Sequence, residues 1–306
     1  MWGEELRRAR SGEIRHEAAY RKILRWAAFL SLPPPMATPF SRLFPRPASV
    51  IAMIHTGPTP GAPGGCDRPA RQVECAVERA IAEARLYAEL GVDGLLIENM
   101  HDVPWVPEAE QGPEVAAFMT RVALQVKKAV RPLPVGVQVL AGANRTSIAV
   151  AFAAGCDFVR VGGWDDAAEA GTVLRYRRAI GAGHLPVWAC VETAPDAAPT
   201  PAVRVAERHR ADTLVVVGGD GSAAPDVDGL EAIRQATALP VVVGGGVGGE
   251  LLAEYAHLAD AFVVGSALKE NGDWRAPVCE RRVRSLIGAV EYVRGCESVS
   301  DRPSGW

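Results

Sequence analysis

The sequence is poor in lysine and lacks the short motifs of common metal and disulfide sites. Its four lysines are Lys22, Lys127, Lys128 and Lys269. None of them stands at the end of one of the first six predicted β-strands, where the lysine of an imine-forming aldolase would be expected. The six cysteines include no C-x-x-C pair, and no H-E-x-x-H occurs. We therefore disfavour imine chemistry and expect the reduced thiols of an intracellular protein rather than a disulfide framework.

Long apolar runs and an excess of positive charge are also missing. No uninterrupted apolar run reaches the roughly eighteen residues that a membrane helix needs. The formal net charge is -3, with a pI of about 6.1, so no global field would attract nucleic acid or an anionic membrane. We expect a cytoplasmic protein with no transmembrane segment and no nucleic-acid partner. Peripheral membrane association, organelle import and a homo-oligomer stay open.

The first part of the chain differs in composition from the rest. Its first thirty residues have the pattern of an amphipathic helix of mixed charge, and their four acidic residues are unlike a mitochondrial presequence. Three prolines at 33–35 then end the pattern. We predict an N-terminal extension, partly helical or disordered, over 1–39, a barrel over 40–295 and a C-terminal tail over 296–306. The first 35 residues are either a loose extension of the folded protein or the result of a translation start placed too far upstream in the gene model.

Short runs of Val, Ile and Leu alternate with helical patterns in eight strand-then-helix units. Strands that are apolar on both faces indicate a parallel sheet. Eight units favour closure into a single (β/α)8 TIM barrel of the α/β class, which commonly takes about 250 residues. A G-x-D pattern precedes two of the strands, at Asp93 and Asp157. The predicted strands are 50–54, 94–97, 135–140, 158–161, 187–191, 213–217, 241–243 and 261–264.

The last two predicted strands end in glycine. Gly244, Gly245 and Gly246 follow the seventh strand, and Gly265 with Ser266 follows the eighth. Glycine lets backbone N–H groups approach an anion closely, and a helix start adds a favourable dipole. In a barrel, the loops after strands seven and eight build a phosphate site beside a short extra helix. We therefore predict that these five residues bind phosphate and that residues 266–269 form the extra helix.

The same glycines have two other interpretations. Gly244, Gly246 and Gly249 match the G-x-G-x-x-G dinucleotide fingerprint, although the next strand ends in Gly265 rather than in an acid for a ribose. The glycines could also only make tight turns. Lys269 follows the predicted extra helix, where it would either neutralise a phosphate or cap a helix in solvent.

Polar side chains stand at the ends of the predicted strands, where barrel enzymes carry their functional groups. We predict catalytic roles for Glu98, His55 and Glu192, and substrate or phosphate binding by Asn99, Arg160 and Gln138. Unpaired burial of a charge is expensive, so Arg160 is expected to point into the barrel with Glu98 as its partner. Such a pair would serve acid–base chemistry or anion binding, or else would only fix packing.

His55 has three possible roles: a base, a metal ligand or a group that positions the substrate. We predict no metal site and identify no cofactor. A divalent metal held by His55, Glu98, Asp102 and Glu192 is an alternative that no recognisable spacing supports. Cys190 lies within a strand, where burial as a small hydrophobe is favoured over nucleophilic work.

Several segments of the chain resemble one known family. VIAMIHTGPTPGAPG (50–64), GVDGLLIENMHDVPW (91–105), PVVVGGGV (240–247) and ADAFVVGSALKENG (259–272) are similar to segments of the BtpA/SgcQ family, and the resemblance runs in order over 40–293. It implies a phosphate-binding (β/α)8 barrel. The founding member is linked to photosystem I biogenesis in cyanobacteria, and the SgcQ proteins occur with sugar-metabolism functions. The resemblance therefore implies the fold and leaves the activity open.

The chain departs from the family pattern at the expected site. Gln138 stands in the place of an asparagine, the loop after the fourth strand is short, and Glu192-Thr193 replaces a lysine-histidine pair. We therefore carry two hypotheses. The first is a barrel that binds a small phosphorylated metabolite, with acid–base catalysis of the isomerase or lyase type on a sugar phosphate. The second is a non-catalytic factor that helps to assemble a membrane complex such as photosystem I.

Overall fold

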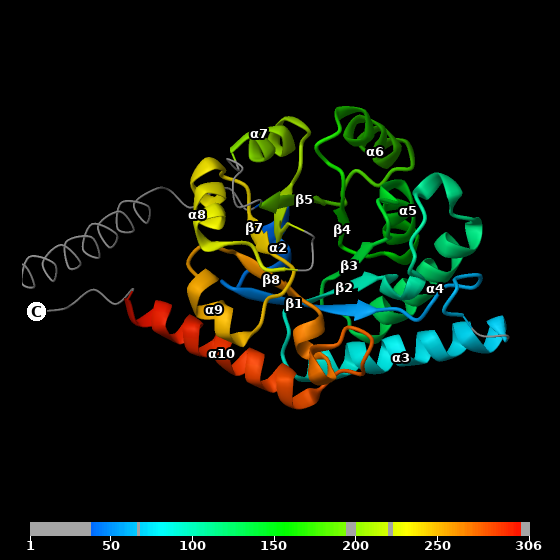
Figure 1. Cartoon of the computed structure of the whole chain (residues 1–306), viewed down its shortest axis with the longest axis horizontal. Helices are drawn as coiled ribbons and strands as arrows, with labels where there is room; N and C mark the ends of the chain where they lie inside the picture. The colour runs from blue at the N-terminus through cyan, green and yellow to red at the C-terminus, as the bar shows by residue number, and fades with distance from the viewer. Residues whose placement is uncertain (1–37, 66–67, 194–199, 220–222, 301–306) are drawn as a thin grey trace, which may run out of the picture. The chain divides into compact units, whose positions relative to one another are not determined.

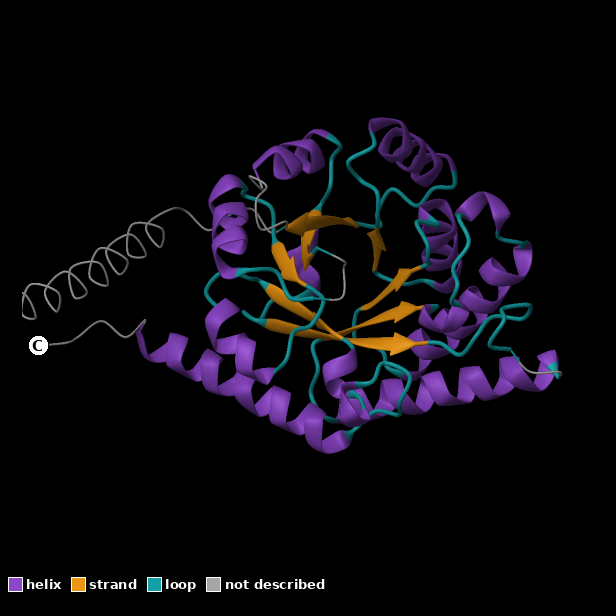
Figure 2. Ribbon diagram, viewed as in Figure 1, coloured by secondary structure: helices purple, strands orange, loops and turns teal. Residues whose placement is uncertain are grey.

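Eight parallel strands close into a barrel in which each strand pairs with its neighbours in chain order, and β8 returns to β1 (Figure 1). The computed structural model describes residues 38–65, 68–193, 200–219 and 223–300. Helices surround the ring of strands on the outside (Figure 2). The predicted (β/α)8 barrel is confirmed, and the dinucleotide-binding alternative is wrong because that fold needs an open sheet.

The elements lie close to their predicted positions. The strands are β1 (Ser49–His55), β2 (Gly94–Glu98), β3 (Val135–Gln138), β4 (Phe158–Val161), β5 (Val187–Thr193), β6 (Thr213–Gly218), β7 (Val241–Val243) and β8 (Ala261–Val264). The α-helices are α2 (Pro39–Leu43), α3 (Pro69–Glu89), α4 (Pro113–Ala129), α5 (Asn144–Ala154), α6 (Ala167–Ala179), α7 (Thr200–Arg208), α8 (Val227–Ala236), α9 (Gly249–Tyr255) and α10 (Glu280–Ser300).

Two boundaries of the predicted domain division can be compared with these elements. Helix α10 continues to Ser300, past the predicted end of the barrel at 295. Helix α2, which packs into the barrel, begins at Pro39, one residue before the predicted start of the barrel at 40. The rest of the predicted N-terminal extension, residues 1–37, lies outside the described residues, as do the last six residues of the predicted tail. Among the described residues, no helix is long and apolar enough to cross a membrane.

Aromatic rings fill the amino-terminal end of the barrel. Phe158 and Trp188 stack inside it with ring centroids 3.9 Å apart. Phe40 and Phe44, carried by α2 and the residue after it, pack against Trp188 at 5.5 and 5.6 Å. The glycine at 94 makes room for this packing, because a Cβ atom there would lie 2.6 Å from the Phe44 ring. Side chains therefore fill the amino-terminal end of the barrel, and a ligand can enter only at the carboxyl-terminal end of the strands.

Four aspartates, which we call the aspartate clamps, tie the amino ends of the strands together in pairs. Each one immediately precedes an even-numbered strand, and its carboxylate accepts a hydrogen bond of 2.7–2.8 Å from the first or second N–H of the preceding odd-numbered strand. Each carboxylate also pairs with a basic side chain. The clamps are Asp93 to Val50, Asp157 to Val135, Asp212 to Val187 and Asp260 to Val241.

Candidate functional site

The two glycine turns lie side by side at the carboxyl ends of the strands. Strands β7 and β8 are paired, with Val243 opposite Phe262, so the turns that follow them are neighbours. Gly245 and Gly246 have φ angles of +73° and +55°, a conformation that side chains rarely adopt. The predicted extra helix is present as the 3₁₀ helix η3 (Ser266–Leu268).

Five backbone N–H groups of these turns have no acceptor among the residues that the structure describes. The five groups are those of Gly245, Gly246, Gly265, Ser266 and Ala267, whereas the N–H of Gly244 donates to Val216 at 2.9 Å. We call the turns 244–246 and 265–267 the glycine cradle. Successive N–H groups in such turns form an anion-binding concavity.

Both turns touch side chains of the barrel interior closely. A Cβ atom at Gly265 would lie 3.3 Å from Nε2 of His55 and 3.2 Å from Sδ of Met53. A Cβ atom at Gly244 would lie 3.9 Å from a terminal nitrogen of Arg160. The absence of side chains at these two positions therefore brings the cradle backbone against His55 on one side and Arg160 on the other.

Four of the predicted site residues form one continuous arc. The strand register pairs His55 with Glu98, and Glu98 with Gln138. Val137 of β3 pairs with Val159 of β4. Gln138 and Arg160, one residue further along each strand, are therefore neighbours too. All four side chains are buried, with exposed fractions of 6–8%. Oε1 of Gln138 has no hydrogen-bond partner among the described residues, which leaves a buried acceptor that a ligand hydroxyl would satisfy.

Arg160 and Glu98 face the same interior but do not form the predicted ion pair. Nε of Arg160 instead donates to Sγ of Cys190, which is 3.1 Å away on the neighbouring strand. No other hydrogen bond of this guanidinium is found within the described part of the chain, so its terminal nitrogens, beside Gly244, remain available. Burial raises the pKa of Glu98, and the charge of Arg160 opposes that rise.

His55 is held as a neutral imidazole. Its Nδ1 donates to the backbone carbonyl of Trp274 at 3.2 Å, and since a carbonyl only accepts, Nε2 carries the lone pair. Burial lowers the pKa of His55 to about 4; the charges of Lys269 and His101 add to this effect, and the hydrogen bond to Trp274 opposes it. The site therefore places an unprotonated Nε2 directly against Gly265.

The other predicted site residues are placed differently. The amide of Asn99 is engaged within the protein: Oδ1 accepts from the N–H of Leu140 at 2.7 Å and Nδ2 donates to Asp102 at 2.9 Å. Asn99 thus ties the loops after β2 and β3 together, and its predicted contact with substrate stays a prediction. Glu192 is exposed near the end of β5. Among the described residues, no three His, Cys, Asp or Glu side chains gather as a metal ion requires.

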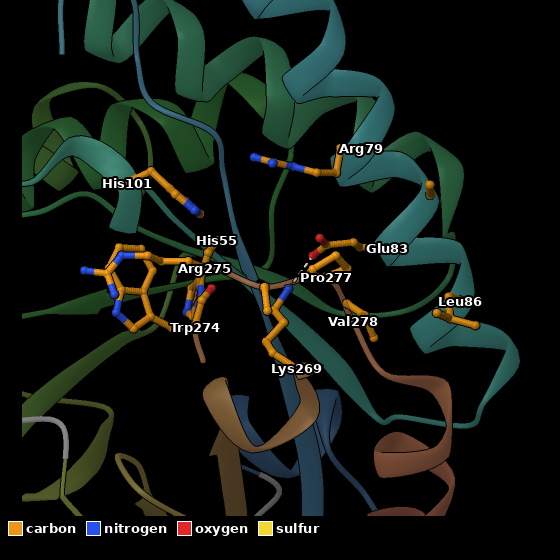
Figure 3. Close-up of a pocket in the computed structure, with 12 residues that line it drawn as sticks. His55, Arg79, Glu83, Leu86, His101, Lys269, Trp274, Arg275, Pro277 and Val278 are labelled. Carbon is orange, nitrogen blue, oxygen red and sulfur yellow. Dashed lines mark hydrogen bonds and ion pairs between the residues drawn. The ribbon is translucent and has the colours of Figure 1, made fainter. Parts of the chain in front are cut away.

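A pocket of about 280 Å³ adjoins His55 (Figure 3). Arg79 and Glu83 line it from α3, His101 from the loop after β2, and Lys269 and Trp274 from the segment after β8. Lys269 is only 1% exposed and donates to Glu83 at 2.7 Å. Both sequence-based expectations for Lys269 are therefore wrong, because it neither caps a helix in solvent nor is free to neutralise a phosphate.

The sequence analysis did not predict this pocket, because Arg79 and Glu83 lie on a helix and not at the end of a strand. The one usable signal was the four-residue spacing of Arg79 and Glu83, which places both on the same helix face. Nothing in the sequence pattern indicated that the residues after β8 would fold back over the pair.

Comparison with known proteins identifies the family. The model described as the BtpA family matches residues 46–292. The chain belongs to the BtpA family. Among its relatives, a Caenorhabditis elegans protein named as uncharacterized and mitochondrial is 29% identical over 80% of this chain and 94% of its own length. The photosystem I biogenesis protein BtpA of Synechocystis is 28% identical to this BtpA-family chain, over 83% of this chain and 90% of its own length.

Solved structures agree on the architecture of this BtpA-family barrel. The (S)-3-O-geranylgeranylglyceryl phosphate synthase of Thermoplasma acidophilum, solved in complex with its substrate sn-glycerol-1-phosphate, superposes with a TM-score of 0.54. The match covers 82% of this chain and 96% of that chain at 13% identity. At this identity the likeness shows the fold alone.

Proposed function

We propose that this protein binds a small phosphorylated metabolite at the open end of the barrel and acts on it as an acid–base enzyme of the isomerase or lyase type. The observation that carries the proposal is the glycine cradle, whose N–H groups have no acceptor among the described residues and lie between a buried cation, Arg160, and an unprotonated ring nitrogen of His55. The substrate of the Thermoplasma neighbour is a phosphate ester, which is consistent with the proposal.

Each polar group of the interior has a defined task in this proposal. The cradle and Arg160 hold the phosphate, because oriented N–H groups and a guanidinium both favour an anion. Nε2 of His55 takes a proton from a substrate carbon next to a carbonyl, and Glu98, whose burial favours the protonated form, gives a proton to the carbonyl oxygen. One proton is taken and one is given, so the substrate becomes an enol without net change in protons.

The low pKa of His55 fits this role only when the ligand is bound. A pKa of about 4 makes the free imidazole a weak base. A phosphate held at Gly265 would stabilise the imidazolium and raise that pKa, because an opposite charge within a few ångströms favours the charged form. The base would therefore gain strength at the moment when the substrate arrives.

Ligand binding can be tested with a charge placed in the cradle. The wild type is screened by thermal shift against phosphorylated metabolites, since a ligand that binds only the folded state raises the melting temperature. Hits are expected to bind Gly265→Asp at least about 10-fold more weakly, since an aspartate would repel the phosphate and displace His55. Gly183→Asp is the control, because a Cβ atom there meets no atom within 4 Å. Absence of any hit, or equal affinity of Gly265→Asp, would refute the proposal.

A second candidate function comes from the Synechocystis relative, which is named for photosystem I biogenesis. A non-catalytic assembly factor would need an interaction surface on the N-terminal extension or on the outer helices, and it would not need the polar arc inside the barrel. Deletion of the gene should then lower the abundance of a membrane complex, and a gene copy carrying Glu98→Gln should restore that abundance fully.

We place the protein in the cytoplasm, with organelle import as the alternative because the Caenorhabditis elegans relative is named mitochondrial.

A further inference from the structure

The pocket beside His55, which we call the α3 pocket, carries an excess of positive charge. Its lining includes three cations, Arg79, Lys269 and Arg275, and one carboxylate, Glu83. Lys269 and Glu83 neutralise each other, and Arg275 lies 3.7 Å from Asp273. Arg79 has no hydrogen bond or ion pair to any residue that the structure describes. It is therefore the cation that a ligand can reach without breaking an existing pair.

Arg79 is aimed into this pocket. It extends from α3 towards His101, which faces it from the opposite wall (Figure 3). Its guanidinium rests on the loop after β1, where a Cβ atom at Gly57 would lie 2.9 Å from its terminal nitrogen. The glycine at 57 thus gives the guanidinium the room to reach this position.

The rest of the lining offers hydrogen-bond acceptors and an aromatic wall. Nδ1 of His101 donates to the carbonyl of Thr56 at 2.6 Å, so Nε2 of His101 carries the lone pair, as in His55. Trp274 packs against the His101 ring at 4.9 Å and covers His55 at 6.1 Å. A ligand suited to this lining has an anionic group for Arg79 and a hydroxyl group for Nε2 of His101.

The α3 pocket and the glycine cradle meet at a single ring. His55 lines the pocket, and the same imidazole lies against Gly265 of the cradle. A ligand with its phosphate in the cradle would therefore pass Nε2 of His55 before reaching Arg79.

We propose that the α3 pocket binds a second anionic group of the same ligand through Arg79, so that the ligand is a small hydroxylated metabolite with a phosphate at one end and a carboxylate or a second phosphate at the other. This inference rests on the proposed function, since it takes the cradle as the first phosphate site. The two anions fix the ligand at both ends, and the carbon atoms between them lie at His55. The pocket would thus decide which phosphorylated metabolites are accepted.

The test uses three probes with the same three-carbon skeleton. Dissociation constants for glycerol 3-phosphate, 3-phosphoglycerate and glycerol 1,3-bisphosphate are measured by calorimetry on the full chain. At least one doubly anionic probe is expected to bind wild type about 10-fold or more tightly than glycerol 3-phosphate, which is the usual size of a charge-assisted hydrogen bond. Whichever of the two gains more identifies the second anion as a carboxylate or a phosphate.

Two arginine variants of the same helix separate the inference from the proposed function. Arg79→Gln is expected to remove the preference for two anions and to leave the affinity for glycerol 3-phosphate within about 2-fold. Arg85→Gln is the control, because Arg85 is exposed on α3 and does not line the pocket. If the preference for two anions is absent in wild type, or survives in Arg79→Gln, the inference is wrong, and the proposed phosphate site in the glycine cradle is unaffected. If glycerol 3-phosphate binds Gly265→Asp as well as wild type, both fail.

Discussion

The buried neutral state of His55 makes the stability of the protein depend on pH in a calculable way. In an unfolded chain this imidazole has a pKa near 6.5, whereas burial lowers the pKa of His55 to about 4 in the folded protein. Between these two values the unfolded state binds a proton that the folded state does not, so stability falls as the pH is lowered. For pH 7.5 to 4.5 the difference between the two pKa values corresponds to a loss of about 2.5 kcal/mol.

The contribution of His55 can be isolated with His55→Asn. The asparagine amide keeps an N–H donor for the Trp274 carbonyl and does not titrate. Urea unfolding at pH 4.5, 5.5, 6.5 and 7.5 gives the free energy of unfolding of both proteins, and the wild type is expected to lose about 2.5 kcal/mol more than the variant over this range. Taking the difference cancels the carboxylates, Glu98 included.

A matched control and one contrary result complete this test. His257→Asn removes an exposed histidine and should leave the pH dependence of wild type unchanged. If His55→Asn shows the same dependence as wild type, His55 is not buried in its neutral form. The assignment of its Nε2 as an unprotonated group beside the cradle would then be wrong.

Two further predictions concern stability. Asp260→Ala removes the acceptor of the Val241 N–H and the partner of Arg234, so we expect the free energy of unfolding measured in urea to fall by about 2 kcal/mol. Asp228→Ala is the control, because Asp228 is exposed. A fall below about 0.5 kcal/mol for Asp260→Ala would show that this aspartate clamp does not stabilise the barrel. Lys269→Met leaves Glu83 without its partner, so we expect a loss of about 2 kcal/mol that Glu83→Gln in the double variant partly restores; no restoration would mean that the lysine acts through packing alone.

The architecture could be predicted because the strands are buried on both faces. Such strands appear in the sequence as continuous apolar runs, and the eight predicted strands all exist with boundaries within two residues of those observed. The runs could not show where hydrogen bonding ends. Strand β1 continues to His55 and β5 to Thr193, since polar residues at the rim still pair with their neighbours.

The aspartate clamps were only half visible in the sequence. The G-x-D pattern indicated Asp93 and Asp157, but Asp212 and Asp260 follow alanine-containing segments with no such pattern. The four aspartates are equivalent because each stands just before an even-numbered strand and accepts a hydrogen bond from the preceding odd-numbered strand. Both are properties of the closed sheet rather than of the local sequence.

The sequence could predict that four of the candidate residues lie together, but it could not predict their contacts. The rule that functional groups end parallel strands led to His55, Glu98, Gln138 and Arg160, which lie together. It could not show that Arg160 would turn to Cys190, because that contact depends on the stagger between β4 and β5. The α3 pocket could not be predicted either, since it needs a helix, a loop after β2 and the segment after β8 to meet.

The aspartate clamps stand at one rim of the ring, and every group assigned to a ligand stands at the other. A substitution among the residues proposed to contact a ligand, such as one at Gln138, therefore falls far from the bonds that hold the strand starts together. The strand starts can therefore keep their hydrogen bonds whatever side chains stand at the opposite rim.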